Sequence, residues 1–159
     1  MIPQETIKAA QAAQRKWGVW ASVSLAQFGV ESAWGRAMPK GSNNPFGIKA
    51  LPGHPSVPAV TREFTHGRYI TIVARFAAFK DFDEAFEEHA KLLATHPHYY
   101  SRAMAHAWKS SAPSAEDFAK ALNGVYATDP HYAETLCNIM RSMNLYQYDD
   151  LKDHPVEVL

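Results

Sequence analysis

The stretch WGVWASVSLAQFGVESAW, residues 17–34, decides the fold of this chain. Its bulky apolar side chains recur every three or four residues, which places them on one face of an α-helix. Other apolar side chains occupy the remaining faces, so the pattern predicts a helix buried in a core rather than one lying on a surface. Polar residues interrupt the apolar run and exclude a membrane span; they are Ser22, Ser24, Gln27, Glu31 and Ser32.

Glu31 is the only ionisable side chain in this stretch. It lies near the predicted end of the helix, which we expect at Gly35. Burial among aromatic side chains and the negative end of the helix dipole both raise the pKa of a carboxyl group. A carboxylic acid that stays protonated near neutral pH is what a general acid needs, so Glu31 is a candidate catalytic residue. The alternative is a structural glutamate that accepts a hydrogen bond or pairs with Arg36.

The composition is that of a single globular domain. The chain has 159 residues, of which 47% are hydrophobic and 20% charged, enough to form a core. Sixteen basic residues balance sixteen acidic ones, so there is no charge bias towards nucleic acid or an anionic membrane. A lone cysteine, Cys137, excludes an internal disulfide, and the sequence contains no motif for a metal, phosphate or serine-nucleophile site. We therefore expect no cofactor and no metal ion, and we also expect a monomer.

A long loop follows the central helix, from residue 35 to residue 59, and long ordered loops are usually functional. It contains GSNNPFGIK, residues 41–49. Asn43 and Asn44 offer amide donors and acceptors, and Phe46 offers a flat apolar ring, which together suit a sugar-binding wall. The alternative is a plain cluster of turn-forming residues.

Residues that favour β-strands dominate only at 60–79, where we predict one small hairpin with a turn at residues 66–67. Glu63 lies on the first arm of this hairpin. Glycosidic cleavage uses two carboxyl groups: one protonates the leaving oxygen, and the other activates water or stabilises the positive charge that develops on the sugar. Glu63 is therefore the candidate partner of Glu31. The alternative is a solvated strand residue beside Arg62.

Helical periodicity and capping signals predict five further helices, at residues 4–17, 81–96, 99–108, 114–124 and 129–143. The chain should therefore fold as a mainly helical α+β protein. We place one domain at residues 1–145 and a loose polar tail at residues 146–159.

Four segments occur in the order in which a known family has them: LAQFGVESAWG (25–35), NNPFGIK (43–49), VTREF (60–64) and YATDPHYAETLCNIM (126–140). Together they resemble the glucosaminidase-domain family of peptidoglycan hydrolases. This family includes the hydrolase domain of the flagellar rod-assembly protein and several bacterial autolysins. The resemblance extends from about residue 21 to residue 143, which is nearly the whole chain.

The resemblance implies a lysozyme-like fold, in which a helical domain and a small β-hairpin lobe flank a cleft. It implies that the substrate is the glycan strand of peptidoglycan, cut at a β-1,4 bond. Glu31 matches the family's catalytic acid, Glu63 matches a second carboxylate, and Tyr126 matches a tyrosine that lines the cleft. The candidate substrate-binding residues are Gln27, Trp34, Asn43, Asn44, Phe46 and Tyr126.

The chain departs from the family pattern at three places. Val125 precedes the motif tyrosine where the family usually has glycine, Pro45 replaces a common leucine, and residues 51–58 carry three prolines. The family favours N-acetylglucosaminidase activity, but a muramidase or lytic transglycosylase uses the same kind of cleft. A catalytically inactive glycan-binding or assembly module is the alternative from another class.

The first residues, MIPQETIKAAQ, lack the basic and apolar pattern of a signal peptide. We expect synthesis in the cytoplasm and action on the cell wall or in the periplasm after delivery. A phage or prophage lysin released through a membrane pore, or an injected effector, fits this expectation.

Overall fold

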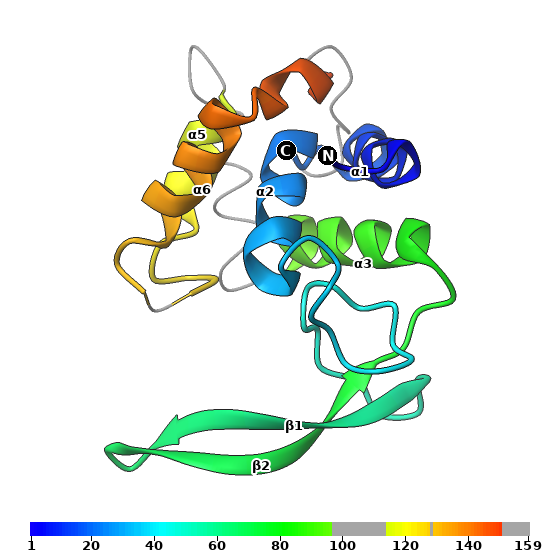
Figure 1. Ribbon diagram of the computed structural model, residues 1–159, viewed down its shortest axis with the longest axis vertical. Coiled ribbons are helices and arrows are strands. Elements are labelled where there is room, and N and C mark those ends of the chain that lie inside the picture. The colour runs from blue at the N-terminus through cyan, green and yellow to red at the C-terminus, as the bar shows by residue number, and fades with distance from the viewer. Residues whose placement is uncertain (97–113, 128, 151–159) are drawn as a thin grey trace.

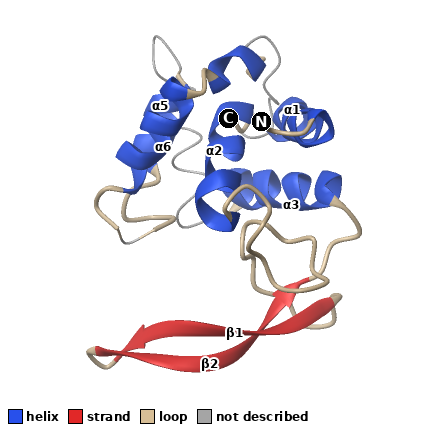
Figure 2. Ribbon diagram, viewed as in Figure 1, coloured by secondary structure: helices blue, strands red, loops and turns tan. Residues whose placement is uncertain are grey.

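The computed structural model describes residues 1–96, 114–127 and 129–150, so the helix predicted at 99–108 lies outside the described residues. The elements are, in chain order, α1 (Gln4–Trp17), α2 (Ala21–Ser32), β1 (Ser56–Thr65), β2 (Arg68–Ala77), α3 (Phe82–Thr95), α5 (Ala115–Ala121), α6 (Tyr132–Ser142) and the short 3₁₀ helix η1 (Leu145–Tyr148). The helices form one body, and the two strands form a hairpin that projects from it (Figure 1, Figure 2). None of the helices in the described ranges is long and apolar enough to cross a membrane.

Helix α2 lies at the centre of the helical body and contacts every other helix that the structure describes (Figure 1). All its residues from Ala21 to Gly29 are buried, as the apolar pattern predicts. Burying a side chain such as Leu25 or Phe28 stabilises a fold by about 1.5–3 kcal/mol relative to leaving it in water. The core is thus assembled around one helix, and the two ends of that helix decide where its functional groups emerge.

The C-terminal end of α2 differs from the prediction. The helix ends at Ser32 rather than near Gly35, and Ala33, Trp34 and Gly35 follow with φ angles of 50°, 62° and 86°. The Ser32 hydroxyl donates to the carbonyl of Phe28 (2.6 Å) and accepts from the backbone N–H of Gly35 (2.8 Å), so a side chain closes the helix before the glycine is reached. Left-handed backbone at a non-glycine residue costs about 1–2 kcal/mol, and such strain is typical of functional sites.

Trp34 folds back onto α2 at Gly29. A Cβ atom at Gly29 would lie 2.5 Å from Cζ2 of the indole, closer than nonbonded carbon atoms approach. The indole also meets Phe28 edge-on, with ring centroids 6.2 Å apart. Glycine at position 29 therefore makes the space that lets the tryptophan cover the end of the helix.

The Gly29→Ala substitution should lower the free energy of unfolding by about 1–3 kcal/mol, because the added methyl group overlaps the indole. In a Trp34→Ala background the same substitution should be neutral or stabilising, since alanine favours a helix over glycine by about 1 kcal/mol. Urea unfolding of the four proteins measures both effects. Equal losses in the two backgrounds would contradict the packing of Trp34 on Gly29.

The β-hairpin has the predicted turn and is longer than predicted. β1 and β2 pair antiparallel, and the turn residues His66 and Gly67 both have positive φ (50° and 79°), as a tight type I′ turn requires. β1 begins at Ser56 rather than Val60, so it includes Pro58. Proline is tolerated there because both strands of a two-stranded sheet are edge strands.

Local capping signals are confirmed at three helix ends. Asp81 accepts a hydrogen bond from the backbone N–H of Glu84 (2.9 Å) at the start of α3. Ser114 accepts one from the backbone N–H of Asp117 (3.1 Å) at the start of α5. Gly18 ends α1 in the left-handed conformation, with φ 79°. Each signal involves residues close together in the chain, which is why the sequence reveals it.

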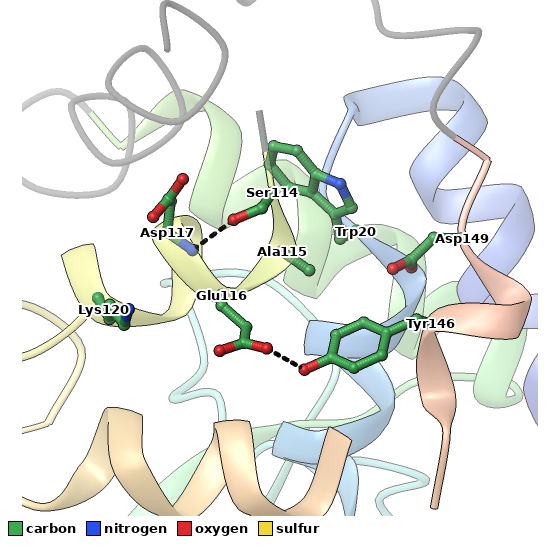
Figure 3. Close-up of a pocket in the computed structure, with 8 residues that line it drawn as sticks. All are labelled: Trp20, Ser114, Ala115, Glu116, Asp117, Lys120, Tyr146 and Asp149. Atoms are coloured by element: carbon green, nitrogen blue, oxygen red, sulfur yellow. Dashed lines mark hydrogen bonds between the residues drawn. The ribbon is translucent and has the colours of Figure 1, made fainter. Parts of the chain in front are cut away.

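Residues 146–150, expected as the start of a loose tail, pack against the helical body instead. Tyr146 donates a hydrogen bond to Glu116 at the start of α5 (2.6 Å). Asp149 accepts two hydrogen bonds from Ser22, one from its backbone N–H and one from its hydroxyl, both 2.7 Å long. Tyr146, Asp149 and Glu116 line a pocket between α5 and the C-terminal segment (Figure 3). These hydrogen bonds, which the polar composition does not reveal, fix the segment.

Asp149 closes the N-terminal end of α2, where the N-cap residue Trp20 makes no side-chain hydrogen bond to the helix. A carboxyl group at this end satisfies backbone donors that have no partner within a helix. Burial raises the pKa of Asp149 to about 6, and the two hydrogen bonds from Ser22 lower it in part. Ser22 and Asp149 lie 127 residues apart, so this cap joins two segments that are distant in the chain.

The raised pKa of Asp149 makes part of the stability depend on pH. The folded protein binds this proton more tightly than the unfolded chain, whose aspartate has a pKa of 3.8. The contribution to the free energy of unfolding is therefore fully present below pH 3.8 and is lost as the pH rises through about 6. Asp149→Asn, which cannot ionise, should avoid this loss, which is on the order of 3 kcal/mol.

Urea unfolding of the wild type and Asp149→Asn between these two pH limits measures the effect. As the pH rises, the free energy of unfolding of the wild type should fall relative to that of Asp149→Asn. A difference that does not change with pH would contradict the assignment of this titration to Asp149.

Candidate active site

A groove of about 800 Å³ lies between α3 and the base of the hairpin. One wall is formed by side chains of α3 between Glu84 and Thr95, and the other by residues 46–55 and 77–79. Glu31, near the end of α2, and Tyr126, in the segment before α6, line the same groove. Apolar walls with a few charged groups are the usual composition of a ligand site, so this groove is the candidate active site.

Glu31 lies where α2 leaves the core. Gly29 is buried, Val30 is 38% exposed, and Glu31 is exposed. The prediction of a buried acid is therefore corrected: the helix is buried up to Gly29, but its one acidic side chain reaches the groove. Desolvation by surrounding groups still raises the pKa of the Glu31 carboxyl, and a hydrogen bond from Tyr132 lowers it in part.

Two buried side chains hold the carboxyl group of Glu31. The Tyr132 hydroxyl donates a hydrogen bond to Glu31 Oε1 (3.1 Å) and accepts one from Gln27 Nε2 (2.9 Å). Gln27 lies one helical turn before Glu31 on α2, and Tyr132 is the first residue of α6. This Gln27–Tyr132–Glu31 chain fixes the direction in which the carboxyl group presents its oxygens.

Gln27 is a predicted site residue that the structure buries, and Tyr132 is a site residue that was not predicted from the sequence. The resemblance places Gln27 near the sugar; in the structure it is fully buried and bonded to Tyr132, and its contact with substrate stays a prediction. Tyr132 was not a candidate site residue, because its spacing with Leu136 and Met140 is that of an apolar helix face. The one signal in the sequence was that a buried tyrosine needs a partner for its hydroxyl.

Tyr126 lies on the groove wall and packs against the group that holds Glu31. Its ring stacks on Tyr132, with centroids 5.6 Å apart and planes at 20°. It also meets His89 edge-on, with centroids 6.2 Å apart. The structure thus brings Tyr126 next to the hydrogen-bond chain, and its contact with substrate stays a prediction.

The two asparagines of the loop bind protein backbone, which differs from the predicted sugar contacts. Asn44 is fully buried, and its amide donates to the carbonyls of Ile48 (2.8 Å) and Ala77 (3.0 Å). Its oxygen accepts from the backbone N–H of Ile48 (3.1 Å). Asn43 donates to the carbonyl of Phe79 (3.1 Å). These amides fasten the loop to the base of β2 and so shape the groove wall.

Phe46, expected as a ring for sugar stacking, and Trp34, a candidate substrate-binding residue, both pack against the protein. Phe46 is 4% exposed and stacks on His89 with ring centroids 3.9 Å apart, so little of the ring reaches the groove that it lines. Trp34 packs on Gly29 and is not one of the described side chains that line the groove. Phe46 therefore supports the groove wall, whereas Trp34 covers the end of α2.

Glu63 lies on β1, close to the hairpin turn, and forms an ion pair with Lys49. Lys49 lines the groove, whereas Glu63 is outside the set of described side chains that do so. The structure therefore does not place the two predicted carboxyl groups on one groove wall, and a catalytic role of Glu63 stays a prediction. The ion pair connects the hairpin to the groove.

The helical body, the projecting hairpin and the glutamate of raised pKa in the groove define the lysozyme-like class of glycoside hydrolases. Within the described ranges, no group of three or more His, Cys, Asp or Glu side chains is placed to hold a metal ion. Residues 7–145 match the model of the Glucosaminidase family, described as mannosyl-glycoprotein endo-beta-N-acetylglucosaminidase. The chain belongs to this family.

Three curated relatives of the chain are bacterial and longer than this chain. The autolysin of Enterococcus faecalis is 36% identical over 152 residues, which cover 91% of this chain and 20% of the autolysin. The peptidoglycan hydrolase FlgJ of Escherichia coli K12 is 34% identical, covering 84% of this chain and 43% of FlgJ. A probable N-acetylmuramidase of Lactococcus lactis is 33% identical, covering 83% of this chain and 31% of the muramidase. The chain thus spans less than half the length of each.

Solved structures confirm the predicted fold. The catalytic domain of the autolysin Auto from Listeria monocytogenes superposes with a TM-score of 0.81 at 34% identity, covering 91% of this chain and 84% of that one. A glycoside hydrolase domain of FlgJ from Salmonella typhimurium superposes with a TM-score of 0.66 at 30% identity, covering 86% of this chain and 91% of that domain.

The hydrogen bond from Tyr132 stabilises the ionised form of Glu31 and so lowers its pKa. Tyr132→Phe removes this bond, so the pKa of Glu31 should rise further. A ¹³C NMR titration of the side-chain carboxyl groups measures this pKa directly. Tyr146→Phe is the matched control, since it removes a hydroxyl that donates to Glu116 rather than to Glu31. An unchanged or lowered pKa of Glu31 in Tyr132→Phe would contradict the hydrogen-bond chain.

Proposed function

We propose that the protein cleaves β-1,4 glycosidic bonds in the glycan strands of peptidoglycan, with Glu31 as the general acid. The observation that carries the proposal is the Glu31 carboxyl group on the groove wall, with a raised pKa and a fixed orientation. Family membership supplies the substrate class, because relatives of this chain are described as peptidoglycan hydrolases and an autolysin.

The hydrogen-bond chain suits proton donation. Before cleavage, desolvation favours the protonated form of Glu31, which is the form that can deliver a proton to the leaving glycosidic oxygen. After donation the carboxylate is negative, and the Tyr132 hydroxyl already points at Oε1 to stabilise that charge. No reorganisation of the site is then needed at the moment of transfer. Cleavage should decline as the pH rises through the raised pKa of Glu31.

The second half of the reaction is attack by water on the anomeric carbon. Glu63 is the candidate carboxylate for this step, carried on the hairpin and paired with Lys49. The alternative is assistance by the N-acetyl group of the substrate itself. Either route leaves Glu31 as the group that protonates the leaving oxygen.

We favour N-acetylglucosaminidase specificity, because that is the activity in the description of the family. The second candidate is cleavage of the other linkage, since relatives from Lactococcus lactis are described as probable N-acetylmuramidases. A binding module without catalysis is the third. Such a module gains nothing from an acid held by two buried side chains.

Digestion of purified peptidoglycan, followed by borohydride reduction and mass spectrometry of the chain ends, tests the proposal. Reduced N-acetylglucosamine ends are expected, and Glu31→Gln should slow their release by a factor of about 100 or more, because the amide cannot donate the proton. Glu87→Gln, which changes a glutamate paired with Lys16 outside the described groove lining, is the matched control and should retain activity.

The other outcomes of this digestion are distinct. Reduced or anhydro N-acetylmuramic acid ends would keep Glu31 as the acid and move the specificity to the second candidate. Full activity of Glu31→Gln would overturn the assignment of the acid. No release by the wild type would favour the binding module.

A further inference from the structure

The hairpin has a face that points away from the protein and is rich in large side chains. Directly paired residues of an antiparallel sheet share a face. Val60 pairs with Val73 and Phe64 pairs with Tyr69, and these four side chains are 63–71% exposed. Arg62 and Arg75 lie at alternate positions of the same face and are also exposed. We call these six residues the outer face.

The opposite face of the hairpin is different. Ile70 and Ile72 are half-buried there, and Phe76 is buried. Glu63 lies on this inner face and pairs with Lys49, which lines the groove. Apolar residues of the inner face are therefore at least partly covered by the protein, whereas those of the outer face are left to solvent.

The charges of the outer face have one sign. Its only ionisable side chains besides the tyrosine are Arg62 and Arg75, and the one acid of the two strands, Glu63, is on the inner face. The whole chain is balanced, with sixteen basic and sixteen acidic residues. A face without acids is therefore a local feature rather than a reflection of a basic protein. Its charge suits an anionic partner.

Three of the side chains contact one another through the ring of Tyr69. The Arg62 guanidinium lies over the Tyr69 ring, 4.7 Å from its centroid, and Phe64 meets the same ring edge-on with centroids 5.1 Å apart. A stacked guanidinium keeps its forked donors directed outwards, which suits bidentate binding of a carboxylate. Further along the face, Ser56 orients Arg75 by accepting a hydrogen bond from its Nε (2.7 Å).

We propose that the outer face docks the protein on the peptidoglycan wall, at a glycan strand other than the one in the groove. This inference rests on the proposed function. The carboxylates of the stem peptides match the two arginines, and the sugar rings of the glycan match the exposed aromatic rings in shape and apolar character. The hairpin ends at Ala77, which lines the groove, so a strand docked on the outer face is held close to the site of cleavage.

Sedimentation with purified insoluble peptidoglycan tests the docking. The assay uses Glu31→Gln as the parent, so that the wall is not digested during the measurement. Adding Arg62→Gln, Phe64→Thr and Tyr69→Thr should weaken binding to the wall by a factor of about ten, because these exposed residues supply a forked donor and two rings. Threonine favours β-strands and glutamine is polar, so the hairpin should keep its fold in the triple variant.

Two further variants serve as a charge control and as a smaller change on the outer face. Arg15→Gln removes the same charge from the exposed side of α1 and should bind the wall as the parent does. Arg62→Gln alone, a smaller change, should weaken binding in the same direction as the triple variant. Thermal unfolding of each protein shows whether its fold is intact. Wall binding that is equal in the parent and in both folded variants would overturn the docking.

Other occupants of the outer face give different results. The triple variant could lose binding to vesicles of equal parts phosphatidylcholine and phosphatidylglycerol while its binding to the wall is unchanged. This result would overturn the inference in favour of a lipid surface. A parent that sediments as a dimer and a triple variant that sediments as a monomer would overturn it in favour of a second copy. Failure of the proposed function is seen separately, as no release of chain ends by the protein with Glu31 intact.

Discussion

The hydrogen bond from Tyr132 to Glu31 is the interaction on which the site depends. The two residues lie 101 positions apart, so the acid acquires its orientation only when α6 packs beside α2. Two opposing effects meet at the carboxyl group: desolvation favours its protonated form, and the tyrosine hydroxyl favours its ionised form. A general acid passes through both forms, and the structure provides for each of them.

The position of Glu31 depends in turn on how α2 is held at both ends. Asp149 accepts hydrogen bonds from the first turn, and Ser32 closes the last turn. Between these ends the helix is buried, so it cannot shift along its axis without disturbing every helix packed around it. The three left-handed residues after Ser32 then turn the chain away sharply, which leaves Glu31 at the edge of the core.

Sequence reasoning succeeded where the signal was local. The apolar pattern of α2, the cap at Asp81 and the turn at residues 66–67 each involve neighbouring residues, and each was predicted correctly. It failed where a side chain is explained by a distant partner. Asn44 has the chemistry of a sugar ligand, but backbone groups up to 33 residues away occupy its amide. Tyr132 has the spacing of a core residue, and only the folded chain brings its hydroxyl to Glu31.

The central claim is that Glu31 protonates the glycosidic oxygen of a strand bound in the groove. A crystal structure of Glu31→Gln with a peptidoglycan tetrasaccharide tests it most directly, since the amide keeps the shape of the acid without its proton. The account predicts a glycosidic oxygen within hydrogen-bonding distance of the residue 31 side chain, about 2.6–3.2 Å. A tetrasaccharide bound in the groove with every glycosidic oxygen far from residue 31, or bound elsewhere on the protein, would contradict it.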